Sequence, residues 1–371
     1  MKKHDQFLEE NKYIFKKYKI IKQIGYGAFG NVYSIKKIKD KDIFAMKTEK
    51  INIDNPKLES EAFYLFTLQK GFGFPKLISY GHVKNYKILI ETLLGKSLND
   101  IFISKKMACN IIEVCLIGKQ ILDRLEWIHS NNIIYRDIKP DNFLIGINDP
   151  DVIYIIDFGL CKKYRSSKTG KHILPKKTGT ISGTIKYLSS NVLKGRESSR
   201  RDDLISLGYM LIYLLKRKLP WDYNITDLND LDEFRINKIK DLKETNGNGK
   251  LFENIPIELV DFVKYTRNLK FEEEPNYSYL HSLLNKIFFK KNLDNEKQCF
   301  SWIKSKKKVN LAQLSISNRG KSSSPFGRIL KNIRENKIKE INIKTVNEVN
   351  LTNSSSYKNL ANKIILIIII K

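Results

Sequence analysis

The chain has 371 residues, and its 67 Lys and Arg against 40 Asp and Glu give a formal net charge of +27. This length admits two domains, or one two-lobed unit with a tail. The four cysteines are scattered without a Cys-x-x-Cys pair, which argues against a disulfide framework or a zinc site and suits a reducing compartment. The positive charge favours acidic partners such as phosphoproteins, nucleic acid or anionic lipid.

Neither end of the sequence predicts membrane insertion. The first residues, MKKHDQFLEENKY, lack the apolar core of a signal peptide. The apolar run at 364–370 is far shorter than the roughly 20 residues that span a bilayer. We interpret this run as a bias toward isoleucine, with contact to a membrane surface or to a partner as the alternatives. We expect no transmembrane segment and a cytoplasmic or nuclear location.

The first predicted elements are short strands. Residues 18–95 alternate apolar and polar side chains in runs bounded by glycine turns, as an antiparallel sheet does. One segment, 58–68, has the period of a helix instead. The strands are expected over 18–24, 30–38, 43–47 and 86–90.

The pattern becomes helical after Gly95. The helices are expected over 111–130, 199–215, 256–269 and 277–289. A small β-rich lobe followed by a larger helical lobe predicts an α+β, bilobal fold with a ligand at the junction. The expected division is an N-terminal extension (1–17), one domain (18–303) with an N-lobe (18–94) and a C-lobe (95–303), and a basic, disordered tail (304–371).

A glycine-rich motif lies near the start of the sheet, from Gly25 to Gly30. A Gly-x-Gly-x-x-Gly motif also fits a dinucleotide site, but there a helix should follow directly. The residues after Gly30 resemble a second strand, so we predict a hairpin that covers phosphate groups with backbone N–H groups. The candidate nucleotide-binding residues of this region are Ile24, Gly25, Gly27, Gly30, Val32 and Ala45.

Lys47 ends a strand-like run, where a lysine reaches the α- and β-phosphates of a nucleotide. Its partner should be a glutamate on the following helix. Glu59 and Glu61 point about 200° apart on a helix, so only one of them faces Lys47. We choose Glu61, which precedes the apolar face of that helix. We expect Leu94 to hydrogen-bond the adenine at the hinge between the lobes.

The segment YRDIKPDN, residues 135–142, is followed fifteen residues later by Asp157-Phe158-Gly159. This spacing is typical of a site that transfers phosphate from ATP with Mg²⁺. Asp137 would accept the proton of the attacking hydroxyl, and Lys139 would neutralise the γ-phosphate. Asn142 and Asp157 would hold magnesium. A lysine two places after the base is typical of serine/threonine transfer.

The region between Asp157 and Arg201 is strongly basic, with twelve Lys and Arg against two acidic residues. We interpret it as a cationic shelf for acidic or phosphorylated peptides. Its candidate substrate-anion residues are Arg165, Lys168 and Lys186.

Several of these segments resemble the casein kinase I family of serine/threonine protein kinases. The resemblance rests on YRDIKPDNFL, DFGLCKKYR, SGTIKYLSSN and SSRRDDLISLGYMLIYLLKRKLPW, and it covers roughly 18–303. It implies a protein kinase fold, ATP, magnesium, and phosphorylation of Ser or Thr in acidic or phosphate-primed proteins. The family usually has an arginine at Lys186, and the stretch 222–233 is acidic where relatives are basic, so the use of priming stays open. The gatekeeper, the residue just before the hinge, is Glu91 by gapless alignment and Ile90 after a one-residue shift.

The alternative function is a catalytically weak kinase-fold scaffold that acts through its basic surface and tail. The basic run at 304–308 also suits nuclear import or nucleic-acid binding, with a solvated linker as the other interpretation. We expect a monomer whose partners are protein substrates.

Overall fold

The computed structural model describes residues 7, 12–27, 30–40, 42–104, 108–222, 233–291 and 300–303, which belong to one compact unit. The predicted tail with its isoleucine run, and the stretch 223–232, lie outside the described residues. Among the described residues, no helix combines the length and apolar character that crossing a bilayer requires.

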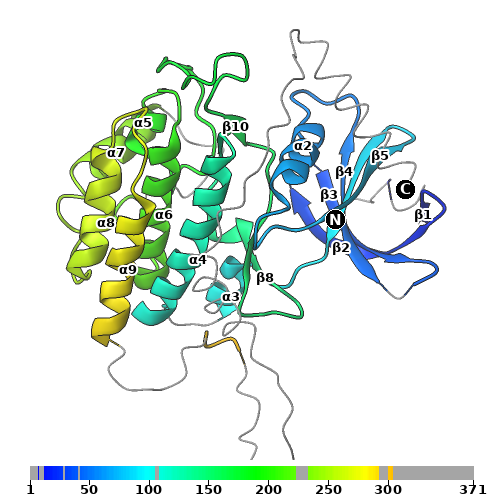
Figure 1. Cartoon of the computed structure of the whole chain (residues 1–371), viewed down its shortest axis with the longest axis horizontal. Coiled ribbons are helices and arrows are strands. Elements are labelled where there is room, and N and C mark those ends of the chain that lie inside the picture. The colour runs from blue at the N-terminus through cyan, green and yellow to red at the C-terminus, as the bar shows by residue number, and fades with distance from the viewer. Residues whose placement is uncertain are drawn as a thin grey trace, which may run out of the picture. The chain divides into compact units, whose positions relative to one another are not determined.

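The N-lobe is built on a six-stranded antiparallel sheet with the order β1-β2-β3-β4-β6-β5 (Figure 1). The predicted alternation of buried and exposed side chains holds only in part: the start of β2 alternates, whereas residues 87–91 of β6 are buried one after another. The strands are β1 (Tyr13–Ile14), β2 (Tyr18–Gly27), β3 (Gly30–Lys37), β4 (Ile43–Lys50), β5 (Leu77–Val83) and β6 (Tyr86–Thr92). Strands β1 and β5 were not predicted.

Helix α2 (Leu58–Leu68) packs on one face of this sheet, against β4, β5 and β6. It begins where the Glu49 carboxylate, from β4, accepts hydrogen bonds from the backbone N–H groups of Lys57 and Leu58 at 2.7 and 3.1 Å. A carboxylate at a helix N-terminus satisfies free N–H groups and complements the helix dipole. The N-terminus of α2 is thereby attached to the strand that carries Lys47.

The opposite face of the sheet holds a second apolar cluster, which includes Tyr33, Ile35 and Ile90. Phe7 and Ile14 join this cluster and are almost fully buried. Part of the segment predicted as an N-terminal extension, 1–17, therefore contributes to the N-lobe, because its apolar side chains cover this face.

The C-lobe is mainly helical, which confirms the α+β, bilobal fold. Two short strand pairs, β7 with β10 and β8 with β9, lie beside the helices. Helices α4, α6, α8 and α9 agree closely with the predicted ranges, whereas α3, α5 and α7 were not predicted. The C-lobe elements are α3 (Leu98–Ser104), α4 (Ile111–Ser130), β7 (Ile133–Ile134), η1 (Pro140–Asn142), β8 (Phe143–Ile145), β9 (Ile153–Ile155), β10 (Lys162–Lys163), α5 (Ser190–Leu193), α6 (Arg200–Lys216), α7 (Glu233–Glu244), α8 (Ile257–Asn268) and α9 (Tyr277–Lys291).

Helix α6 forms the centre of the C-lobe and is buried along most of its length. It packs against α4 and α8. A Cβ added at Gly208 would lie 2.8 Å from a methyl group of Val263, so only glycine permits this approach of α6 to α8. The carboxylate of Asp203, near the start of α6, thus has a rigid support.

The first prediction concerns the N-terminus of α4. The Asn110 side chain accepts a hydrogen bond from the Glu113 backbone N–H at 2.8 Å, and the Glu113 carboxylate accepts one from the Asn110 backbone N–H at 3.1 Å. Asn110→Ala should lower the free energy of unfolding by about 1 kcal/mol. Urea denaturation measures this, with Glu126→Gln on the exposed face of α4 as the control. Equal stability of Asn110→Ala and the wild type would contradict the capping role.

Candidate active site

A pocket of about 1020 Å³ is lined by residues of both lobes. The N-lobe contributes its glycine-rich hairpin and β4, and the C-lobe contributes Leu144 and Asp157. The predicted nucleotide residues that line this pocket are Ile24, Gly25, Gly30, Val32, Ala45, Lys47, Glu61, Leu94 and Asp157. The remaining one, Gly27, pairs with Gly30 across the hairpin.

The glycine-rich segment joins two paired strands, β2 and β3, and so forms a hairpin rather than a strand-to-helix turn. Gly30 has a φ of 153°, and a Cβ built on it would lie 1.7 Å from the carbonyl oxygen of Thr48. Only glycine fits this close approach to β4. The prediction of a hairpin in place of a dinucleotide-binding turn is confirmed.

The Lys47 ammonium is shared between two carboxylates. It forms an ion pair with Glu61 from α2, and it lies 3.2 Å from Oε1 of Glu91 at the end of β6. The structure thus pairs Lys47 with Glu61, the glutamate chosen from the sequence. Glu59 is exposed and pairs with Lys87 at 3.1 Å. The contact with Glu91 was not predicted.

The charges around Lys47 are unequal, since Glu61, Glu91 and Asp157 act on one ammonium. Burial lowers the pKa of Lys47, but these carboxylates outweigh burial and raise it, so Lys47 stays charged. Burial raises the pKa of Glu61, and although Lys47 opposes this, Asp157 and Glu91 raise it further, to about 7. A bound cation would reduce the electrostatic repulsion between these carboxylates.

The two gatekeeper candidates lie on opposite faces of the sheet. Ile90 is fully buried in the apolar cluster with Tyr33 and Ile35. Glu91 faces the other way, lines the pocket and pairs in register with Ala45. Of the two candidates, Glu91 is thus the one whose side chain faces the pocket.

The catalytic-loop residues converge on Asp137, which is 5% exposed. Lys139 Nζ lies 2.8 Å from Oδ2 of Asp137, and the Asn142 amide donates to the same oxygen at 2.9 Å. The Thr184 hydroxyl donates to Oδ1 at 2.8 Å. Burial lowers the pKa of Lys139, but the Asp137 carboxylate outweighs burial and raises it, so Lys139 stays cationic. Thr184 was not predicted.

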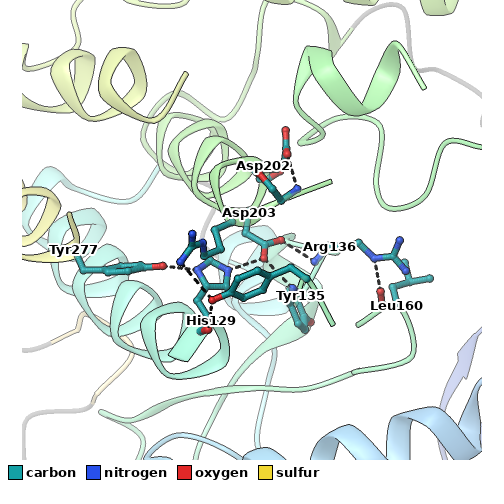
Figure 2. Close-up of polar contacts among 11 residues, drawn as sticks. His129, Tyr135, Arg136, Leu160, Asp202, Asp203 and Tyr277 are labelled. Atoms are coloured by element: carbon teal, nitrogen blue, oxygen red, sulfur yellow. Dashed lines mark hydrogen bonds and ion pairs between the residues drawn. The ribbon is translucent and has the colours of Figure 1, made fainter. Parts of the chain in front are cut away.

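Asp203 holds the backbone of this loop from helix α6, as Figure 2 shows. Its carboxylate accepts hydrogen bonds from the backbone N–H groups of Tyr135 and Arg136 at 2.8 and 2.7 Å. It also contacts Nε2 of His129 at 2.9 Å, and the other ring nitrogen of His129 contacts the Tyr277 hydroxyl at 2.6 Å. Arg136 has a left-handed backbone with φ of 71°, a strained conformation that these bonds stabilise.

The side chains of Asp157 and Phe158 have separate environments. Phe158 is fully buried and stacks on Phe74, with ring centroids 6.0 Å apart. Asp157 lines the pocket and acts electrostatically on Lys47. With Phe158 in the core, the Asp157 carboxylate is available to the ligand of the pocket.

The comparison with known protein families agrees with this geometry. Residues 18–289, well over half of the chain, match the family model described as "Protein kinase domain". The chain belongs to the protein kinase family. Such a domain implies ATP, a divalent metal ion and protein substrates.

The oxygen atoms of the kinase site suit a divalent cation. The Asn142 amide nitrogen donates to Asp137, which leaves the amide oxygen as an acceptor. Asp157 adds a carboxylate. Hard cations such as Mg²⁺ take oxygen ligands and are commonly held by one or two protein groups together with phosphates.

Two buried side chains, Glu197 and Lys243, hold the activation segment of the kinase, the residues from Asp157 to Arg201. Lys162 lies 2.8 Å from Glu197, whose side chain is 2% exposed. Lys243 is fully buried and donates hydrogen bonds to the carbonyl oxygens of Ile185, Lys186 and Leu188 at 2.8, 3.2 and 2.5 Å. Burial lowers the pKa of Lys243 well below its usual value. These contacts hold the loop that follows Thr184.

The three substrate-anion candidates do not form one cluster of free cations. Lys186 Nζ lies 3.0 Å from the Asp222 carboxylate and 3.7 Å from the centre of the Tyr213 ring. Arg165 donates to the carbonyl oxygen of Gly170 at 3.3 Å, and Lys168 is exposed in the same turn. Their role in substrate binding stays a prediction, and Lys186 has an internal partner that competes with any substrate anion.

The second prediction follows from the raised pKa of Glu61. Its pKa is about 7 in the folded protein against an ordinary 4.5, so between these values the folded state keeps a proton that the unfolded state has lost. This contribution to stability is present below pH 4.5 and is lost as pH rises through 7. From pH 5 to 8, the wild type should lose up to about 3 kcal/mol relative to Glu61→Gln in urea denaturation.

The matched control for this measurement is Glu59→Gln, which changes an exposed glutamate of the same helix. It should follow the pH dependence of the wild type. A stability difference between the wild type and Glu61→Gln that is the same at both pH values would contradict the assignment.

Proposed function

We propose that this kinase transfers the γ-phosphate of ATP, with Mg²⁺, to serine or threonine residues of acidic or phosphate-primed proteins, in the manner of the casein kinase I family. The observation that carries the proposal is the set of contacts on Asp137. Lys139 occupies one carboxylate oxygen and Thr184 the other, so a cation and a hydroxyl surround the place where the acceptor hydroxyl would approach.

The residues divide the work of the reaction. Asp137 orients the acceptor hydroxyl and takes its proton as the oxygen attacks phosphorus. Lys139, which stays cationic, stabilises the negative charge on the transferred phosphoryl group. Mg²⁺, when bound with ATP, shields the phosphate charges, and Asn142 and Asp157 are the residues that would hold it.

Lys47 and Glu61 prepare the N-lobe side of the site. Their ion pair orients the ammonium toward the pocket, where it would bind the α- and β-phosphates. The pair forms between β4 and α2, so it also sets the distance of the helix from the sheet. The presence of this pair supports a catalytic function over a scaffold that only binds partners.

The charge of the activation segment supports the proposed substrate class. The segment from Asp157 to Arg201 contains twelve Lys and Arg but two acidic residues. One of these two, Glu197, is neutralised by Lys162, and Lys176 lies 4.0 Å away. The surplus positive charge favours peptides that carry Asp, Glu or phosphate near the acceptor residue.

The third prediction tests catalysis directly. Asp137→Asn should lower kcat/KM for a protein substrate such as casein by about a thousandfold, because the base is lost. The affinity for ADP should stay within about threefold of the wild type, since Asp137 is not among the residues that line the pocket. A radiolabel transfer assay and calorimetry measure the two quantities. Undiminished transfer by Asp137→Asn would contradict the mechanism.

The fourth prediction tests whether Lys186 reads a priming phosphate. Asp222→Asn removes the charged partner of Lys186 and should raise kcat/KM for a phosphoprimed peptide about fivefold or more. The same peptide without the phosphate is the control and should change little. No change in the ratio between the two peptides would exclude Lys186 as the priming site.

A further inference from the structure

Glu91 presents a carboxylate oxygen to which none of the described residues donates a hydrogen bond. The residue is 4% exposed and lines the nucleotide pocket. Its Oε1 lies 3.2 Å from Lys47, whereas its Oε2 is buried and has no hydrogen-bond partner within the part of the chain that the structure describes. A buried carboxylate oxygen that has lost its hydrogen bonds to water is costly unless a donor replaces them. The pocket therefore contains a strong hydrogen-bond acceptor, Oε2 of Glu91, to which no described residue donates.

The surroundings of Glu91 show which part of a nucleotide comes near it. Glu91 pairs in register with Ala45, and these two residues and Leu144 line the same pocket. Ala45 and Leu144 offer apolar contact that suits a flat base rather than phosphates. Lys47 and Asp157 supply the charges that suit the phosphates and their cation. Glu91 lies where the apolar part and the charged part of the pocket meet.

We propose that Glu91 determines base specificity: its Oε2 accepts a hydrogen bond from the 6-amino group of adenine. A base with a 6-oxo group, such as hypoxanthine or guanine, would place an acceptor against this carboxylate and leave Oε2 without a donor. Sites that hydrogen-bond one group reject an analogue that lacks it, because buried polar atoms are then left unpaired. The inference deepens the proposed function and rests on ATP as the phosphate donor.

An ion pair with Lys47 would account for the burial of only one of the two carboxylate oxygens of Glu91. Lys47 already forms an ion pair with Glu61, and the contact with Glu91 uses Oε1 alone. Oε2 has no function in that role, and an apolar side chain at this position would avoid the cost of burying it. A donor from the base accounts for the oxygen that Lys47 leaves unpaired.

Calorimetry with the full chain tests the proposal by comparing ADP with inosine diphosphate, whose base carries a 6-oxo group. The wild type should bind ADP at least tenfold more tightly. In Glu91→Gln, the amide can donate to the 6-oxo group, so the affinity ratio of ADP to inosine diphosphate should fall about tenfold or more. Glu91→Met, which has no hydrogen-bonding carboxylate, should also lower the ratio. Thermal unfolding of each variant confirms that it is folded.

The control is Glu59→Gln, which removes one negative charge from the same lobe at an exposed position outside the pocket, and it should keep the wild-type ratio. An unchanged ratio in both Glu91 variants would overturn the proposal while leaving the kinase function intact, because ADP would still bind. Failure of the wild type to bind either nucleotide would overturn the proposed function and this inference together.

Discussion

The active site depends on the buried carboxylate of Asp203. This group is 2% exposed and receives hydrogen bonds from two consecutive backbone N–H groups, those of Tyr135 and Arg136. Inside a protein such bonds to a charged acceptor are strong, and the carboxylate could not be buried without them. The bonds hold Arg136 in a left-handed conformation that it would otherwise avoid, and the next residue is Asp137. The direction of Asp137, the proposed catalytic base, is therefore set by a helix in the middle of the C-lobe.

A second constraint connects the N-lobe to the same chemistry. Lys47 joins β4 to α2 through Glu61, and Glu49 on the same strand caps the start of that helix. The site places Glu61, Glu91 and Asp157 around one ammonium. Burial raises the pKa of Glu61, and Asp157 and Glu91 raise it further against the opposing effect of Lys47. This arrangement sacrifices some stability of the free protein, because like charges are held close together in a buried region. A cation bound with the nucleotide would offset that repulsion.

Much of the site could be predicted from the sequence, because its residues stand in short segments with fixed spacing. Asp137, Lys139 and Asn142 lie in one loop. The hairpin glycines and Lys47 lie beside or on neighbouring strands whose sequence pattern is clear. Helical geometry allows only one of Glu59 and Glu61 to face Lys47, and Glu61 could be chosen because it precedes the apolar face of the helix. The contacts of Thr184 with Asp137 and of Glu91 with Lys47 could not be predicted, since each joins residues more than forty positions apart in the chain.

The missed parts of the fold have similar physical causes. Helix α7 is strongly polar and buries little more than Ile239 and Lys243, so its sequence resembles a surface segment. Lys243 in particular would be read as a solvated lysine, yet it is fully buried and donates to three carbonyl oxygens of the loop after Thr184. Its role depends on where the loop packs. The internal partner of Lys186 likewise appears only in three dimensions, because Asp222 lies well beyond the activation segment in sequence.

The most direct test of the central claim is to identify the amino acid that receives the phosphate. The full chain would be incubated with ATP, Mg²⁺ and casein, and the phosphorylated residues of casein would be determined by mass spectrometry. A lysine two places after Asp137 is typical of transfer to serine or threonine, and the basic segment between Asp157 and Arg201 favours acidic peptides. Phosphoserine and phosphothreonine are therefore predicted at sites flanked by acidic residues. Phosphate found on tyrosine, or no transfer by a protein that binds ATP and Mg²⁺, would contradict the account.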